Sequence, residues 1–142
     1  MSGEMQLTKL LSSLSAELVD GLFVFVTLPD ASLPAGLVPR MIFQEAEGTT
    51  LILLKDEAEA AGLAYEFPCR MITLNVHSSL EAVGFLARVT TELAGHDMGV
   101  NPVAGFFHDH LFVPDGREQD ALEALARLAA SNQVAGGTSL KP

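Results

Sequence analysis

The chain has 142 residues, of which 49% are hydrophobic and 18% charged, a composition typical of a folded globular protein. Eighteen acidic residues against eight basic ones give a net charge of −10, which excludes nucleic acid and anionic membrane surfaces as favoured partners. No apolar run approaches the roughly 20 residues that span a bilayer, and "MSGEMQLTKLL" lacks the features of an export signal. With Cys69 as the single cysteine, the sequence predicts a cytoplasmic protein without disulfides.

The first half of the chain predicts a helix, a buried strand, a hairpin and a second helix. Apolar residues at helical spacing indicate a helix over 7–18, and a β-branched and aromatic run over 22–28 indicates a buried strand. A loop rich in Pro and Gly then leads to two strands joined at Glu47-Gly48, a dipeptide suited to a hairpin turn. A short acidic helix is expected from about Asp56.

The second half predicts similar elements with a longer helix. Alternating apolar and polar residues over 70–76 indicate a half-buried strand, and 77–97 indicates a helix of about four turns. A hairpin over 100–113 and a last helix from about Gly116 follow, and the tail 132–142 is expected to be loose. Because "TTLILLKDEAEAAGL" and "HDHLFVPDGREQDAL" share the order of strand, Asp and acidic helix start, we expect two related α+β modules.

Four motifs resemble a known family. "ITLNVHSSLEAVG" and "NPVAGFFHDHLFVP" are similar to signatures of a small bacterial family of tandem ACT-like proteins, and "GLFVFVTLPD" and "EGTTLILLKDEAEAAGL" resemble it more weakly. The resemblance implies an α+β fold of two ferredoxin-like ACT modules, over 1–66 and 67–131, whose antiparallel sheets have helices packed on one face. It further implies a non-catalytic regulatory protein that binds a small effector, an amino acid, without a cofactor. The many apolar residues, with strand edges and helix faces to cover, predict a homodimer.

The candidate ligand site lies where the strand 70–76 turns into the next helix, beside the following strand. Ser78 and Glu81 match a capping box, so they either close the helix start or leave its backbone N–H groups for a ligand carboxylate. Gly84, expected within the helix, indicates either close approach of a ligand or partner, or a tolerated imperfection. The candidate ligand-binding residues are His77, Ser78, Ser79, Leu80, Glu81, Gly84, Asn101, Val103, Ala104, Gly105, His108 and His110.

His108 and His110 have three interpretations. In a regular strand they point to one side and could chelate a metal, with Asp109 pointing the other way. A zinc site needs three or four ligands, however, and no further His or Cys lies at a recognisable spacing. We favour a solvated hairpin tip, followed by the lining of a ligand pocket, and expect no metal.

Catalysis is not expected from this sequence. Arg70 could lower the pKa of the neighbouring Cys69, but no histidine lies nearby in sequence to act as a base. Nucleophile elbows, P-loops, Rossmann glycine patterns and zinc-protease motifs are absent. The alternatives to a ligand-binding regulator are a small enzyme that uses the histidines, with or without a metal, and a dimerisation module that binds no ligand.

Overall fold

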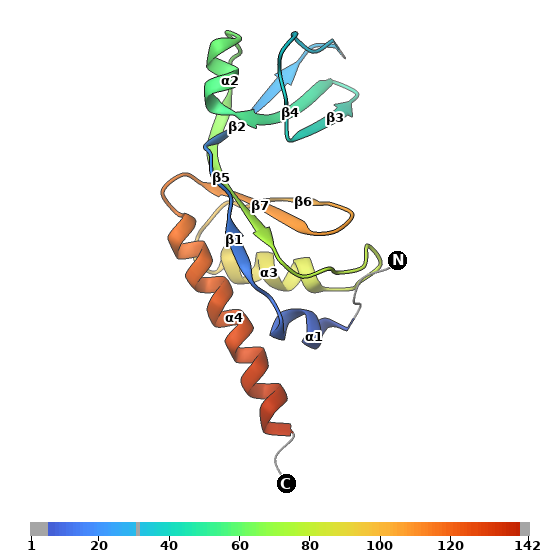
Figure 1. Cartoon of the computed structure of the whole chain (residues 1–142), viewed down its shortest axis with the longest axis vertical. Coiled ribbons are helices and arrows are strands. Elements are labelled where there is room, and N and C mark those ends of the chain that lie inside the picture. The colour runs from blue at the N-terminus through green and yellow to red at the C-terminus, as the bar shows by residue number, and fades with distance from the viewer. Residues whose placement is uncertain (1–5, 31, 140–142) are drawn as a thin grey trace.

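Seven antiparallel strands and four helices lie within residues 6–30 and 32–139, the part of the chain that this computed structural model describes. One sheet joins an upper and a lower lobe, and the first and last helices lie together at the lower end (Figure 1). In chain order the elements are α1 (Leu7–Ser12), β1 (Ala16–Leu18), β2 (Phe23–Leu28), β3 (Met41–Glu45), β4 (Gly48–Leu54), α2 (Lys55–Ala60), β5 (Glu66–Leu74), α3 (Phe85–Ala94), β6 (Asn101–Ala104), β7 (Asp109–Pro114) and α4 (Glu118–Ser139).

β5 belongs to both lobes and joins them. The strand order is β3-β4-β2-β5-β7-β6, with β1 also paired to β5. The beginning of β5 pairs with β2 in the upper lobe, and its second part lies between β7 and β1 in the lower lobe. The upper lobe therefore contains β2, β3, β4, α2 and the start of β5, and the lower lobe contains the remaining elements.

The two halves of the sheet repeat one another in register. The β2–β4 ladder and the β5–β7 ladder have six pairs each, and each ends on a buried polar residue. Leu28 pairs with Thr49 at the end of the first ladder, and Leu74 pairs with Asp109 at the corresponding end of the second. This repeat agrees with the expectation of two related α+β modules.

The helices cover one face of the sheet, as predicted. Side chains of β2 and β4 pack against α2, and side chains of β5 and β7 pack against α1, α3 and α4. Strand register places these two covered surfaces on the same side of the sheet. On the other side, a third cluster joins the lobes, and it is built around Phe23, Ile52, Cys69, Met71 and Phe112.

The segment 7–18 is not one helix, as the sequence predicts, but divides into α1 and β1. At the end of α1 the hydroxyl groups of Ser12 and Ser13 donate to the backbone oxygen of Lys9, at 3.1 and 2.7 Å, in competition with further helical bonds. The chain then turns into β1, which pairs with β5. Both elements contribute to the lower core, so the N-terminal segment completes the lobe of the second half. The proposed module boundary between residues 66 and 67 falls within β5.

α4 is longer than the sequence predicts. The tail from residue 132 was expected to be loose, but the helix continues to Ser139, and residues 140–142 lie outside the described residues. Asn132 donates to the backbone oxygen of Leu128 at 2.8 Å, and Gln133 donates to that of Ser12 at 2.7 Å, which holds the extension against the end of α1. Among the described residues no helix has the length and apolar character of a membrane span.

Gly48, at the β3–β4 hairpin, lies where the backbone of β2 approaches closely. Its φ is +156°, and a Cβ at this position would collide with the backbone oxygen of Leu28. We expect Gly48→Ala to lower the free energy of unfolding by about 1–3 kcal/mol, measured by urea denaturation. Gly99→Ala is the control, because a Cβ there has no neighbour within 4 Å. Equal denaturation midpoints for the two variants would contradict this interpretation of the hairpin.

Candidate ligand-binding site

A cavity of about 160 Å³ lies between the loop that follows β5, the start of α3 and the end of β6. Five of the residues that the sequence predicts for the site lie in its wall: Ser78, Ser79 and Leu80 from the loop, and Ala104 and Gly105 from β6 and its end. The cavity is lined by Ser78, Ser79, Leu80, Ala82, Phe85, Leu86, Ala104, Gly105 and Asp109. The structure therefore brings together the strand–helix turn and the neighbouring strand, as expected.

The loop before α3 differs from the prediction of a capping box. Helix α3 begins at Phe85 rather than near Ser78. The Ser78 hydroxyl donates to Asp109 Oδ2 at 3.3 Å instead of capping a helix, and the Glu81 N–H donates to Ser79 Oγ at 3.1 Å within the loop. Gly84 is not in mid-helix but is the N-cap residue, with φ of +90°. This left-handed conformation, which glycine adopts without steric cost, is the physical reason for the glycine.

The first two residues of α3 line the cavity. No side chain forms a hydrogen bond that caps this helix, whose N-cap is Gly84. The first N–H groups of a helix have no partner inside the helix and carry a partial positive charge. Phe85 and Leu86, which carry two of these groups, line the cavity. A carboxylate is the ligand group that such a helix end favours.

Asp109 supplies the opposite charge to the same cavity. It is 8% exposed and accepts the Ser78 hydrogen bond described above. Burial raises the pKa of Asp109, while the Ser78 hydrogen bond and the charges of His110 and His108 act in the opposite direction. A buried carboxylate with a single side-chain partner retains acceptor capacity, which a ligand ammonium group can use.

Asp109 is not among the residues that the sequence predicts for this site, because in sequence it stands between His108 and His110. A signal was present in the alternation of the strand. Asp109 has the same parity as Leu111 and Val113, whose side chains are fully buried beneath the helices. An acidic residue in this row must lie at the covered face of the sheet.

The two histidines do not form a chelating pair at the cavity. His110 lies on the opposite face of the sheet from Asp109, where its Nδ1 shares a 3.0 Å hydrogen bond with the Thr73 hydroxyl. Burial is the main cause that lowers the pKa of His110. The backbone oxygen of His108 accepts a 2.9 Å hydrogen bond from the Gly105 N–H and closes the hairpin. Within residues 6–30 and 32–139, no three His, Cys, Asp or Glu side chains are grouped so that they could hold a metal ion.

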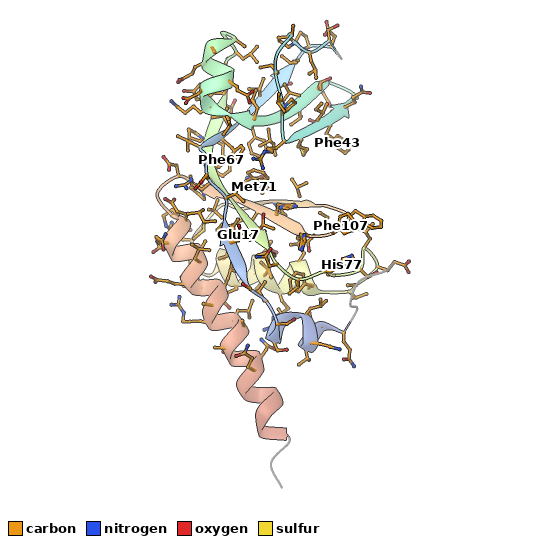
Figure 2. All side chains as sticks on the ribbon, in the orientation of Figure 1. Glu17, Phe43, Phe67, Met71, His77 and Phe107 are labelled. Carbon is orange, nitrogen blue, oxygen red and sulfur yellow. The ribbon has the colours of Figure 1, made fainter. Side chains whose placement is uncertain are left out.

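The remaining predicted residues lie outside the cavity wall. The His77 ring contacts the Phe107 ring in the β6–β7 turn, with centroids 5.6 Å apart, and Figure 2 shows both at the same end of the lower lobe. Glu81 is exposed, and Asn101 lies at the far end of β6. Val103 is paired with His110, so it faces away from Asp109.

The pKa of Cys69 is raised, not lowered by Arg70 as the sequence suggests. Burial raises the pKa of Cys69 to about 12, and the charge of Asp115 acts in the same direction. The thiol lies 3.4 Å from the backbone oxygen of Phe23, and Arg70 pairs instead with Glu118 at 3.0 Å. A buried thiol of this kind is a poor nucleophile.

Comparison with known proteins identifies the family. Residues 2–70 and residues 66–127 each match a family described as ACT domain. The structure is similar to that of VC0802 from Vibrio cholerae, a protein of unknown function and possible transport protein, with 43% identity, a TM-score of 0.79 and coverage of 87% of this chain and 95% of that one.

Two further solved structures share the fold at low sequence identity. Atu0741 from Agrobacterium tumefaciens has a TM-score of 0.71 and 16% identity, over 82% of this chain and 89% of that one. The regulatory subunit of aspartate kinase from Thermus thermophilus has a TM-score of 0.62 and 12% identity, over 80% and 95%. No match was found among curated proteins. The two domain matches and the repeated sheet confirm the predicted α+β fold, and the chain belongs to the ACT-domain family as a protein of two ferredoxin-like ACT domains in tandem.

Proposed function

We propose that this protein is a non-catalytic regulator that binds a free amino acid in the cavity beside Asp109. ACT domains are typically small-molecule-binding regulatory modules, and one of the similar structures is a regulatory subunit of aspartate kinase. The choice of an amino acid, a homodimeric state and a cytoplasmic location are parts of the proposal.

One observation carries the choice of ligand. The uncapped start of α3 and the buried carboxylate of Asp109 border the same cavity, so it offers a site for an anion and a site for a cation. A free amino acid carries a carboxylate and an ammonium group on the same carbon atom. Leu80, Phe85 and Leu86 supply an apolar wall for its side chain. The volume of about 160 Å³ lies below the ~300–1,000 Å³ of sites for drug-sized ligands, which favours a small amino acid.

Ligand binding can regulate the protein only if two of its arrangements differ in their affinity for the ligand. The cavity wall joins elements that are far apart in sequence: the 77–84 loop, α3 and the β6–β7 hairpin. An amino acid held between them stabilises the arrangement in which they are close together. Such an arrangement can then be recognised by a partner of the protein.

The proposal is tested by a thermal-shift screen with the twenty amino acids. A ligand at a hundred times its Kd stabilises the folded state by about 2.7 kcal/mol, which raises the melting temperature by several degrees. We expect one or a few amino acids to produce this shift, and their methyl esters and N-acetyl derivatives to lose it because each lacks one of the two charges. The absence of a shift with all twenty would contradict the proposal.

A further inference from the structure

The upper lobe contains a gap in the sheet that the lower lobe fills. In the lower lobe, β1 pairs with β5 as far as Leu74. Leu28 is the corresponding residue of β2, since Leu74 and Leu28 end the two equivalent ladders. Within the described residues, however, β5 pairs with β2 only as far as Phe25, opposite Glu66. The edge of β2 that follows Phe25 therefore has no neighbouring strand on this side.

A bulge in β5 produces the gap. Between the pairs that β2 forms with Cys69 and with Glu66, β5 has one residue more than β2. Phe67 adopts φ of +58° at this bulge, and its ring packs on that of Phe25 with centroids 5.8 Å apart. Pro68, which has no N–H to donate, follows directly. A bulge bends its strand, so the chain before Glu66 diverges from β2.

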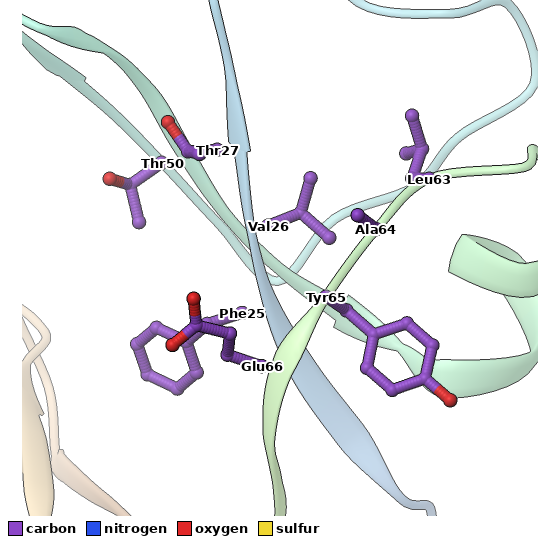
Figure 3. A pocket seen from close by; sticks show the side chains of 8 residues that line it. All are labelled: Phe25, Val26, Thr27, Thr50, Leu63, Ala64, Tyr65 and Glu66. Atoms are coloured by element: carbon purple, nitrogen blue, oxygen red, sulfur yellow. The ribbon is translucent and has the colours of Figure 1, made fainter.

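A cavity of about 360 Å³ occupies the gap, within the range typical of small-molecule sites. Register places Phe25, Thr27, Thr50 and Glu66 on one face of the sheet. Figure 3 shows the Glu66 carboxylate beside the Phe25 ring, and the Tyr65 ring on the other side of the strand. The cavity is lined by Phe25, Val26, Thr27, Thr50, Leu63, Ala64, Tyr65 and Glu66.

The residues that line this cavity carry a negative charge and no positive one. Glu66 is the only charged residue in the lining, and its carboxylate forms no hydrogen bond or ion pair with any residue that the structure describes. The Phe25 ring lies directly across the strands from it. A carboxylate and an aromatic ring together attract an organic ammonium ion. The net charge of −10 also raises the local concentration of cations.

We propose that this cavity is a second binding site, specific for a small organic cation with a protonated primary amine and a short apolar body. The amine lies between Glu66 and the Phe25 ring, and the hydroxyl of Thr27 adds an acceptor. Val26 and Leu63 contact the apolar body. No basic residue is among those that line this site; Lys55 lies over the Tyr65 ring, with its Nζ 5.8 Å from the centroid, and is paired with Glu59 at 2.8 Å. The lining itself therefore has no cationic partner for a carboxylate. It therefore differs in selectivity from the Asp109 cavity.

The test is an NMR titration of the ¹⁵N-labelled full chain with three probes of similar shape: 3-methylbutylammonium, 3-methylbutan-1-ol and 4-methylpentanoate. The amine is expected to shift the amide signals of Thr27, Thr50 and Ala64. The alcohol should bind about tenfold more weakly and the anion not at all. Absence of saturable shifts with the amine up to about 10 mM overturns the proposal, as do shifts confined to the surroundings of Asp109.

Variants separate this site from the other one. Glu66→Gln keeps the shape of the side chain and removes its charge, and it is expected to weaken binding of the amine at least about tenfold. Glu47→Gln is the matched control, because Glu47 lies in the β3–β4 turn outside the cavity and should leave the affinity unchanged. Asp109→Asn should also leave it unchanged, so a failure here does not affect the amino-acid proposal. Equal affinities of the wild type and Glu66→Gln overturn the assignment.

Discussion

Replacing Asp109 by asparagine is expected to weaken amino-acid binding strongly while making the ligand-free protein more stable at neutral pH. Asparagine has nearly the same shape and can still accept the Ser78 hydrogen bond. It cannot form the charge-assisted bond to a ligand ammonium group, which is worth about 1.5–3 kcal/mol. The affinity should therefore fall roughly 10- to 150-fold, measured by isothermal titration calorimetry.

The gain in stability follows from the pKa of Asp109. Burial raises this pKa in the folded state, so folding favours the protonated carboxyl. Its stabilising contribution is present below the unfolded pKa and is lost as the pH rises through the raised folded pKa. Asparagine does not titrate, so it avoids this loss of stability as the pH rises.

Melting temperatures from pH 4 to 8 measure this effect. The advantage of Asp109→Asn over the wild type should grow with pH. Asp20→Asn is the control, since Asp20 is exposed and should change neither affinity nor stability. Unchanged affinity in Asp109→Asn would contradict the assigned role of the carboxylate. Lower stability than the wild type at neutral pH would show that the carboxylate supports the fold.

Truncating Phe112 to alanine is expected to lower the free energy of unfolding by about 3–5 kcal/mol. Phe112 is 2% exposed and lies in the cluster that joins the lobes. Its ring makes edge-to-face contacts with Phe23 and Phe25, at centroid distances of 5.9 and 6.1 Å. The substitution removes these contacts and leaves a cavity between strands of both lobes.

Urea denaturation followed by circular dichroism measures the loss. Phe43→Ala is the matched control, because Phe43 is 61% exposed and its truncation should change stability by no more than about 0.5 kcal/mol. Since the cluster contains residues of both lobes, the wild type should unfold in one transition. A loss below about 1 kcal/mol for Phe112→Ala, or two separate transitions in the wild type, would contradict this description of the interface.

Local patterns in the sequence predicted most strands, and contacts between distant residues explain the errors. The β3–β4 hairpin was predicted correctly because its alternation and its turn at Gly48 are local. Ala16 to Leu18 continue the helical spacing of α1, and only their pairing with β5 makes them a strand. Ser78 fitted a capping box, but its hydroxyl bonds to Asp109 in another strand.

In the candidate site, too, local sequence patterns predicted some features, and contacts between distant residues decided the others. The turn at Ser78 and the end of β6 at Gly105 were predicted to meet, and both line the cavity. Asp109 was missed because its direction depends on which face of β7 the helices cover. The cavity at Glu66 had no sequence signal, since it arises from a bulge and from the absence of a pairing that β1 provides in the other lobe.

The order of the lobes along the chain has a consequence for protein synthesis. The upper lobe is built from the contiguous segment between β2 and the start of β5, so it can fold as soon as that segment leaves the ribosome. The lower lobe needs α1 and β1 together with α4, and Gln133 bonds to Ser12 across 121 positions of sequence. In this first-made segment β1 has no partner strand until β5 is made, and α1 is not covered until the last helix emerges. Truncation at either end of the chain would therefore damage the same lobe, the one that contains Asp109.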